Sequence, residues 1–152
     1  LDTFNDILKE KETSLAVQRA AALAYQDRGQ HDDAKYFENA IHGGYAVKST
    51  SQNRIWGWLK IAQVAAQAAR QDVKFKDAFY EARLNVSRCR YLSAMKQVGD
   101  ARRQELTKAK QTIQSVAQLY PDLGGDKWKP QFDQLLKDIE SDEQHIPAEK
   151  KS

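Results

Sequence analysis

Histidine and cysteine are the residue types in this chain that most often carry catalysis or hold metal ions. The three histidines, His31, His42 and His145, are far apart, and none has an acidic or thiol partner at a metal-ligand spacing such as His-x3-His. The single cysteine, Cys89, has no matching histidine signal, so we expect a buried structural thiol. The sequence therefore predicts no enzyme activity, no metal and no cofactor.

Basic residues are a second group that could take part in binding. From Glu81 to Lys110 the chain has eight basic residues against three acidic ones, a local net charge of +5. Guanidinium groups bind carboxylates and phosphates through paired hydrogen bonds, so cations converging from two helices near the Val98-Gly99 turn would suit a carboxylate, a phosphate or an acidic peptide. The candidate contact residues for such a partner are Arg83, Asn85, Arg88, Arg90, Lys96, Arg102 and Arg103.

The same basic residues have an alternative interpretation as a solvated surface whose charges pair with one another, such as Arg102 with Glu105. The tryptophans also have two interpretations. Trp56, Trp58 and Trp128 could be platforms for a ligand, but tryptophans at helical spacing beside alanines are more typical of a core. We therefore predict a core role for the tryptophans and keep both interpretations of the basic residues.

The length and composition are those of one folded domain. The 152 residues are enough for a single core, and 41% hydrophobic with 30% charged residues is typical of a soluble protein rather than of a disordered or fibrous one. The net charge of +3 is small for this length and does not by itself indicate a polyanion partner. No stretch is apolar enough to cross a bilayer. Because residue 1 is Leu rather than Met, we expect a fragment or a processed product.

Apolar residues recur at spacings of three and four along most of the chain, which predicts about six helices, and no segment alternates as a strand would. We interpret residues 3–11 as the tail of an earlier element, and we expect Gly29 to end the first full helix. Residues 49–51 are expected to cap the third helix. The predicted helices span residues 14–28, 34–41, 52–70, 72–95, 101–120 and 126–139.

Two of the predicted helices carry information about their neighbours. The helix over 72–95 has two separate apolar stripes, so we expect it to pack against other helices on two sides. The helix over 52–70 is apolar around nearly its whole circumference, which predicts burial on several sides. Both patterns favour a stack of helices in which each buries the apolar face of the next.

Consecutive pairs of the predicted helices resemble tetratricopeptide repeats. Two segments of the chain have residues of the types that this repeat requires at the required spacing. In the better copy, the matching residues are Leu84, Ser87, Tyr91, Ala109, Ile113, Val116 and Pro121. Arg88 stands where the pattern has glycine, and the turn around Gly99 is about four residues longer than usual. A weaker copy spans residues 21–40. The resemblance implies an antiparallel helix-hairpin array, an α-solenoid, with a concave and a convex face.

We expect one all-α helical-repeat domain over residues 1–143, followed by a flexible tail over residues 144–152. The resemblance implies binding of peptide segments or partner proteins. Our leading hypothesis is a scaffold domain, part of a larger protein, that binds a protein or peptide in a groove between helices, and the basic residues favour an acidic partner. The alternative function is nucleic-acid or polyanion binding through the basic 83–110 segment. A purely structural role as a spacer is the third possibility. The sequence does not identify the partner, the compartment or the oligomeric state.

Overall fold

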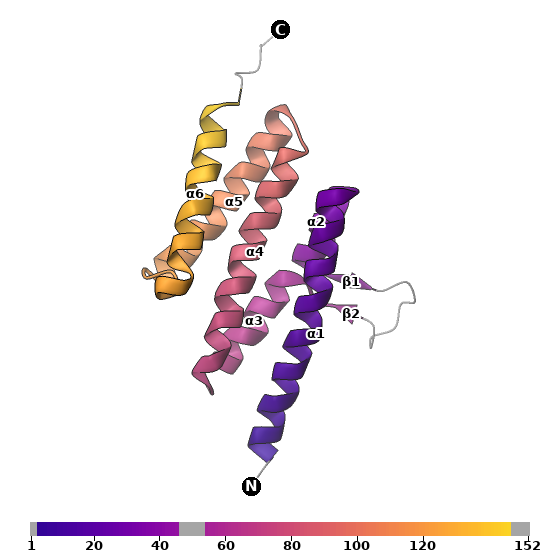
Figure 1. Cartoon of the computed structure of the whole chain (residues 1–152), viewed down its shortest axis with the longest axis vertical. Helices are drawn as coiled ribbons and strands as arrows, with labels where there is room; N and C mark the ends of the chain where they lie inside the picture. Colours follow the sequence, from indigo (N-terminus) through magenta and orange to yellow (C-terminus); the bar gives the residue numbers. More distant parts are fainter. Residues whose placement is uncertain (1–2, 46–53, 147–152) are drawn as a thin grey trace.

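The computed structural model describes residues 3–45 and 54–146, and within these ranges it contains six α-helices, so the all-α class is confirmed (Figure 1). The helices are α1 (Thr3–His31), α2 (Lys35–His42), α3 (Gly57–Ala69), α4 (Lys76–Met95), α5 (Gly99–Leu119) and α6 (Lys129–Gln144). Two short strands, β1 (Gly44–Tyr45) and β2 (Arg54–Ile55), and two 3-10 turns, η2 (Val73–Phe75) and η3 (Gly125–Lys127), complete the described elements. No helix among these residues is both long and apolar enough to cross a membrane.

The helices pack mainly on their neighbours in the sequence. In Figure 1, α1, α4 and α6 lie in one layer and run in the same direction, with α3 and α5 behind them in the opposite direction. Helix α4 is the centre of this arrangement, because it contacts α3 and α5 extensively and also touches α1 and α6 on either side. The front layer thus leaves one face of α4 between two flanking helices.

The two apolar stripes predicted for the fourth helix are confirmed. Ala82, Val86 and Cys89 belong to a core shared with α1, α2 and α3, whereas Tyr80 and Leu84 belong to a second core shared with α5 and α6. Helix α4 is therefore the wall between two hydrophobic cores, and its remaining surface is the part that faces the front.

The first helix is longer than predicted. Residues 3–11 and 14–28 form one continuous helix, because Leu8, Leu15 and Ala22 repeat at seven-residue spacing and are all buried on the same side. Gly29 does not end this helix but lies inside its last turn. A Cβ atom at Gly29 would lie 2.7 Å from the ring of Phe37, so the glycine allows close contact between α1 and α2.

The third helix begins later than predicted, at Gly57 rather than near residue 52. The sequence analysis missed the short antiparallel pairing of Arg54 and Ile55 with Tyr45 and Gly44, which takes up the residues before it. Two residues per strand are too few for an alternating pattern to appear. The expected cap at residues 49–51 lies outside the described residues.

The helix boundaries in the second half follow the prediction within a few residues. Asp72 accepts a hydrogen bond from the backbone nitrogen of Lys74 at 3.0 Å and starts the η2 turn that leads into α4. Asp126 lies in η3 rather than capping α6, and Pro130 is in the first turn of α6, where its missing N–H costs least. Helix α6 extends to Gln144, while residues 147–152 of the predicted tail lie outside the described part.

Candidate functional site

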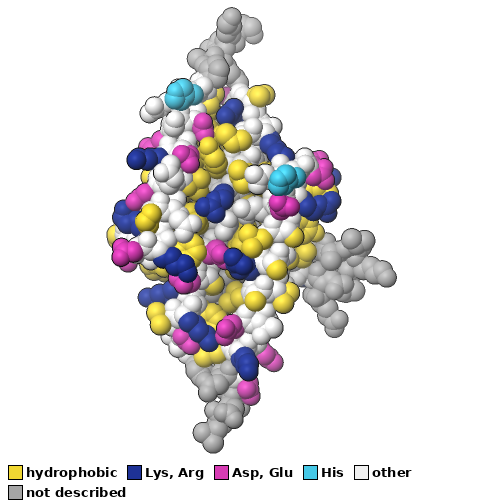
Figure 2. Space-filling view, viewed as in Figure 1, with side chains coloured by type: hydrophobic (Ala, Val, Ile, Leu, Met, Phe, Trp, Pro, Cys, Tyr) yellow, Lys and Arg dark blue, Asp and Glu magenta, His cyan; other side chains and the backbone are white. Residues whose placement is uncertain are grey.

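Two pockets open on the face of α4 that lies between α1 and α6. The first has a volume of about 430 Å³ and lies where α1, η2, α4 and η3 meet. Its lining is largely apolar, and the apolar residues are Leu15, Ala16, Ile61, Phe75, Ala78 and Trp128. Figure 2 shows hydrophobic side chains reaching the surface of this face, with basic and acidic side chains interspersed among them.

Charged residues around the first pocket are already paired. Arg19 of α1 donates two hydrogen bonds to the carboxylate of Glu81 on α4, one of them 2.9 Å long. The hydrogen bond to Glu81 raises the pKa of Arg19. Lys74 Nζ lies 3.0 Å from Glu12 Oε2, which links η2 to α1. These pairs connect the elements that form the pocket and cancel each other's charge.

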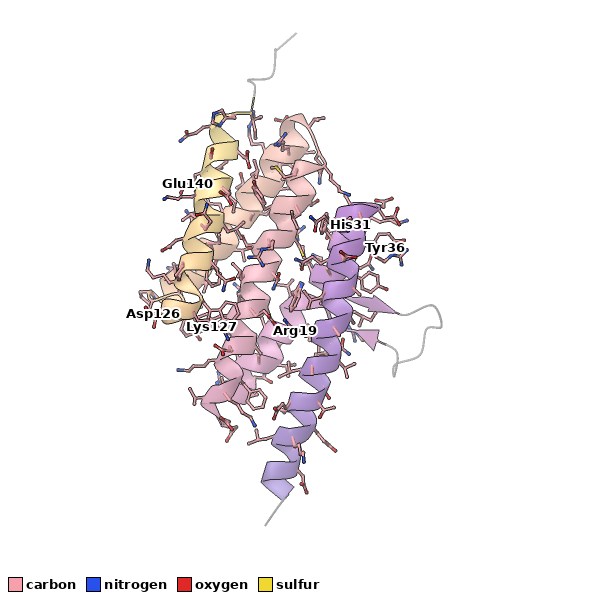
Figure 3. All side chains as sticks on the ribbon, in the orientation of Figure 1. Arg19, His31, Tyr36, Asp126, Lys127 and Glu140 are labelled. Carbon is pink, nitrogen blue, oxygen red and sulfur yellow. The ribbon has the colours of Figure 1, made fainter. Side chains whose placement is uncertain are left out.

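A third pair closes the opposite side of the first pocket. Asp77 of α4 accepts a hydrogen bond from Trp128 Nε1 at 2.9 Å and another from Lys127 Nζ at 3.0 Å. These two hydrogen bonds, that from Trp128 first, lower the pKa of Asp77. In Figure 3, Arg19 lies on the side of α1 toward α4, and Lys127 lies at the base of α6. The pocket therefore has an apolar lining and a rim of paired charges.

The second pocket, of about 400 Å³, lies further along the same face, between α4 and α6. Leu92 and Leu135 supply apolar lining, and Arg88 and Tyr91 also line it. The Tyr91 hydroxyl donates a 2.5 Å hydrogen bond to Asp142 Oδ2. Burial, followed by this hydrogen bond, raises the pKa of Tyr91 to about 12, so the phenol is neutral at physiological pH. We call the surface formed by both pockets, from Phe75 at the end of η2 to Leu92 of α4, the α4 groove.

A polar network forms the floor of the α4 groove between the two pockets. Asn85 is buried, its Nδ2 donates to the Glu81 carbonyl at 2.9 Å, and its Oδ1 accepts from Gln26 Nε2 at 3.2 Å. Gln26 Oε1 in turn accepts from Trp58 Nε1 at 3.0 Å and from Cys89 Sγ at 3.3 Å. The network fixes α1, α3 and α4 relative to one another.

Arg88 is the basic residue of the groove that lacks a carboxylate partner. Its guanidinium donates a 3.3 Å hydrogen bond to Asn85 Oδ1, and no described carboxylate lies within ion-pair distance of it. Desolvation by burial lowers the pKa of Arg88. Asp138, which lines the same pocket, instead accepts a hydrogen bond from Gln134 Nε2 at 3.0 Å. A partly buried cation thus points into a largely apolar groove.

Of the seven predicted contact residues, Arg88 lines a pocket and Asn85 binds it, whereas the other five are not among the residues that line either pocket. Arg90 Nη1 lies 2.6 Å from Glu38 and 3.5 Å from Glu105, so it joins α4 to α2 and α5. Helical geometry places Arg90 roughly 160° around α4 from Arg88.

The remaining predicted cations have separate surroundings. Arg103 pairs with Asp100 at 2.6 Å in the first turn of α5, and Lys96 Nζ lies 3.5 Å from the Asp32 carbonyl. Arg83 is desolvated, which lowers its pKa, and it has no carboxylate at ion-pair distance among the residues described. These side chains are therefore spread over the surface and over several helix contacts.

The predicted pair between Arg102 and Glu105 does not form. Glu105 is buried and pairs with Arg90 and with Lys108, at 3.5 Å and 3.3 Å. Arg102 instead points its Nη2 toward the sulfur of Met95 at 3.4 Å. The reason is geometric, because Glu105 faces α4 and meets Arg90 there.

The prediction that the tryptophans belong to the core is confirmed for Trp58, which is 0% exposed, and for Trp128, which is 7% exposed. Trp128 nevertheless also forms one wall of the first pocket. Sequence analysis missed Leu15, Phe75 and Ala78 as pocket residues, because they are ordinary apolar residues on different elements. Apolar periodicity predicts that these residues are buried, but it does not predict whether a pocket lies beside them.

Two histidines have an acidic partner that the sequence analysis missed, in each case four residues earlier on the same helix. His31 Nδ1 lies 3.1 Å from the Asp27 side chain, and His42 Nε2 lies 3.4 Å from Glu38. His145 Nδ1 lies 2.6 Å from the Ser141 carbonyl. No group of three or more potential metal ligands comes together in residues 3–45 and 54–146.

Comparison with known proteins gives no relative. No family model matches this sequence, and no curated protein or solved structure shows significant similarity to it. We therefore base the function on the geometry of the α4 groove.

Proposed function

We propose that this protein is an interaction domain that binds a segment of a partner protein in the α4 groove. The observation that carries this proposal is the presence of two largely apolar pockets in line on one face of α4, flanked by α1 and α6. Grooves of this kind accept peptide side chains in their pockets while polar groups at the rim fix the orientation.

The dimensions of the groove suit a peptide rather than a small metabolite. Phe75 and Leu92 are separated by roughly 25 Å along the axis of α4, at 1.5 Å per residue. An extended peptide covers this distance with about seven or eight residues, at roughly 3.3 Å each. A partner segment of that length could place one side chain in each pocket.

The charge distribution favours a protein partner over a nucleic acid. Among the cations of the basic segment, Arg90 pairs with Glu38, and Lys110 pairs with Glu140 and Glu143. Arg103 and Lys108 are paired as well, so four of the eight cations already have a carboxylate. Paired cations release few counterions, which weakens the segment as a surface for a phosphate backbone. A predominantly electrostatic role for residues 83–110 therefore has less support than the α4 groove.

The finer architecture that we propose is a divergent tetratricopeptide-like array in which α4 and α5 form one repeat. Support comes from their close packing, where buried Ser87 donates a 2.7 Å hydrogen bond to the Ala109 carbonyl. Leu84 and Ile113, two positions of the repeat pattern, are both in the core between these helices. In such an array α1, α4 and α6 would line the binding face.

Selection of peptides from a phage-displayed random library on the immobilised protein tests the proposed function. We expect peptides that bind the parent protein and lose binding to Ala78→Glu, which introduces a charge at the wall of the first pocket. Gln114→Glu, which introduces the same charge at an exposed position of α5, is the matched control and should bind normally. Failure to select any peptide, or selected peptides that ignore Ala78→Glu, would contradict the proposal.

A further inference from the structure

We infer that the partner segment held in the α4 groove carries an acidic side chain, Asp or Glu, which pairs with Arg88. This inference rests on the proposed function and adds the chemistry of the partner. It follows from a comparison of the charged groups along the groove, in which Arg88 differs from every other cation that lines the two pockets.

The other cations of the α4 groove each have a carboxylate from the protein itself. Arg19 binds Glu81 through two hydrogen bonds, and Lys74 binds Glu12. Lys127 binds Asp77. These pairs need nothing from a ligand, so the rim of the first pocket is electrically neutral and suits an apolar side chain.

Among the described residues, the acceptor bound by Arg88 is the neutral amide oxygen of Asn85, which also accepts a hydrogen bond from Gln26. A guanidinium has five N–H donors, so one shared acceptor leaves most of its hydrogen-bonding capacity for another group. A carboxylate placed against the guanidinium would form a charge-assisted and bidentate contact, which is the strongest interaction available to Arg88.

The acidic residues nearest to Arg88 do not fill this role. Glu81 lies on the same helix, but both of its carboxylate oxygens are held by Arg19. Asp138 lines the same pocket and is bound by Gln134, outside ion-pair distance of Arg88. Among the described residues, Arg88 is therefore a partly buried cation with no carboxylate at ion-pair distance. Burial lowers its pKa, and the charge of Glu81 opposes this only in part.

The placement of Arg88 also sets a spacing in the partner. Ala78, in the first pocket, lies roughly 15 Å from Arg88 along the axis of α4, at 1.5 Å per residue. An extended segment spans this distance with four or five residues, at roughly 3.3 Å each. We expect an apolar residue for the first pocket and an acidic residue about four or five positions away.

The test compares peptide selections on three forms of the full chain. The parent protein, Arg88→Gln and Arg83→Gln are each screened with the same random phage library, and the selected peptides are sequenced. Arg83→Gln is the matched control, because Arg83 is a second desolvated arginine of α4 without a carboxylate partner among the described residues. It lies roughly 140° around the helix from Arg88, outside both pockets.

We expect Asp or Glu to be enriched at one position of peptides selected on the parent and on Arg83→Gln, and not on Arg88→Gln. A synthetic peptide from the parent selection should bind Arg88→Gln about ten to a hundred times more weakly. Replacing its acidic residue by the amide should weaken binding to the parent by a similar factor and have little further effect on Arg88→Gln.

The possible failures are distinguishable. Peptides that are sensitive to Ala78→Glu but carry no enriched acidic residue would overturn the role of Arg88 and leave the proposed function standing. The same conclusion would follow if the losses of binding free energy from Arg88→Gln and from the amide peptide were additive. Additive losses would mean that Arg88 and the acidic residue do not contact each other. An absence of peptides sensitive to Ala78→Glu would overturn the proposed function itself.

Discussion

The two faces of α4 use the same residue types for different purposes. On the side packed against α2 and α5, Arg90 is anchored by Glu38 and Glu105, and its side chain is only 13% exposed. On the side between α1 and α6, Arg88 donates to an amide oxygen that Asn85 shares with Gln26, and no carboxylate of the described residues pairs with it. The comparison shows that arginines close together in a sequence separate once the helix forms. Arg90 joins helices through carboxylates, whereas Arg88 has no carboxylate at ion-pair distance among the described residues.

The apolar residues of α4 also differ in what they contact. Ala82 is 0% exposed and lies in the core with α1, α2 and α3. Ala78, one turn earlier, packs against that core but also reaches the wall of the first pocket. The packed face should therefore determine stability, and the groove face should determine binding. Four predictions test this division.

The largest effect is expected from a charge on the packed face. Ala82→Glu would bury a carboxylate without a partner, at a cost of more than about 4 kcal/mol, and should prevent folding. Ala78→Glu should cost less than about 1 kcal/mol, because its side chain reaches the open pocket. Circular dichroism during urea unfolding measures the loss of stability in each variant. Comparable losses of stability in the two variants would remove the distinction between the faces.

The second prediction concerns the thiol beneath the groove. Cys89 is 0% exposed, and burial raises its pKa to about 12. Folding therefore keeps the thiol protonated at pH 8 and decreases its thiolate fraction about a thousandfold relative to an ordinary cysteine. Labelling by a thiol-reactive dye should be at least a hundred times slower in the native protein than in denaturant, by that same estimate. Rapid native labelling would mean that the contact between α1 and α4 opens readily.

The third prediction compares the two arginines directly. Arg90→Ala leaves Glu105, whose side chain is only 10% exposed, with Lys108 alone and should lower the free energy of unfolding by about 2 kcal/mol. Arg88→Ala removes a partly buried cation that has no described carboxylate at ion-pair distance and should change stability by less than about 1 kcal/mol. Urea midpoints of the two variants, measured under identical conditions, compare their losses of stability. A larger loss for Arg88→Ala would assign it a structural role.

The smallest effect is expected at Asp77, on the rim of the first pocket. Hydrogen bonds from Trp128 and Lys127 lower its pKa, so its contribution is present above the unfolded pKa and is lost as the pH falls through the folded pKa. The loss should be less than about 1 kcal/mol, because the carboxylate is largely exposed. Asp77→Asn should have a smaller decrease in urea midpoint between pH 5 and pH 2 than the parent. Identical acid profiles would show that these hydrogen bonds contribute nothing.

Much of the fold could be predicted from periodicity alone. The two stripes of α4 fixed its position between two cores, and the all-round apolar pattern of α3 indicated its burial, as Trp58 confirms. The errors arose where long-range contacts override local signals. Gly29 stays within α1 because the Phe37 ring packs against it, and residues 54–55 pair as a strand too short to leave a pattern.

The candidate site was less accessible to sequence analysis. Arg88 and Asn85 were among the predicted contacts, but so were Arg90 and Arg103, which have carboxylate partners. To distinguish the groove residues from the paired arginines, one must know which helix each side chain faces. Glu38, for example, is 52 residues from Arg90 in the sequence and its partner in space. No spacing rule contains that information.

The most direct test of the central claim is to map the bound peptide by NMR. A peptide selected on the parent protein is titrated into isotopically labelled protein, and the amide chemical shifts are followed residue by residue. We predict that the largest changes lie on the groove face of α4 and on the facing sides of α1 and α6, around Leu15, Ala78, Leu92 and Leu135. Changes concentrated on α3 and α5 instead would contradict the assignment of the α4 groove as the binding surface.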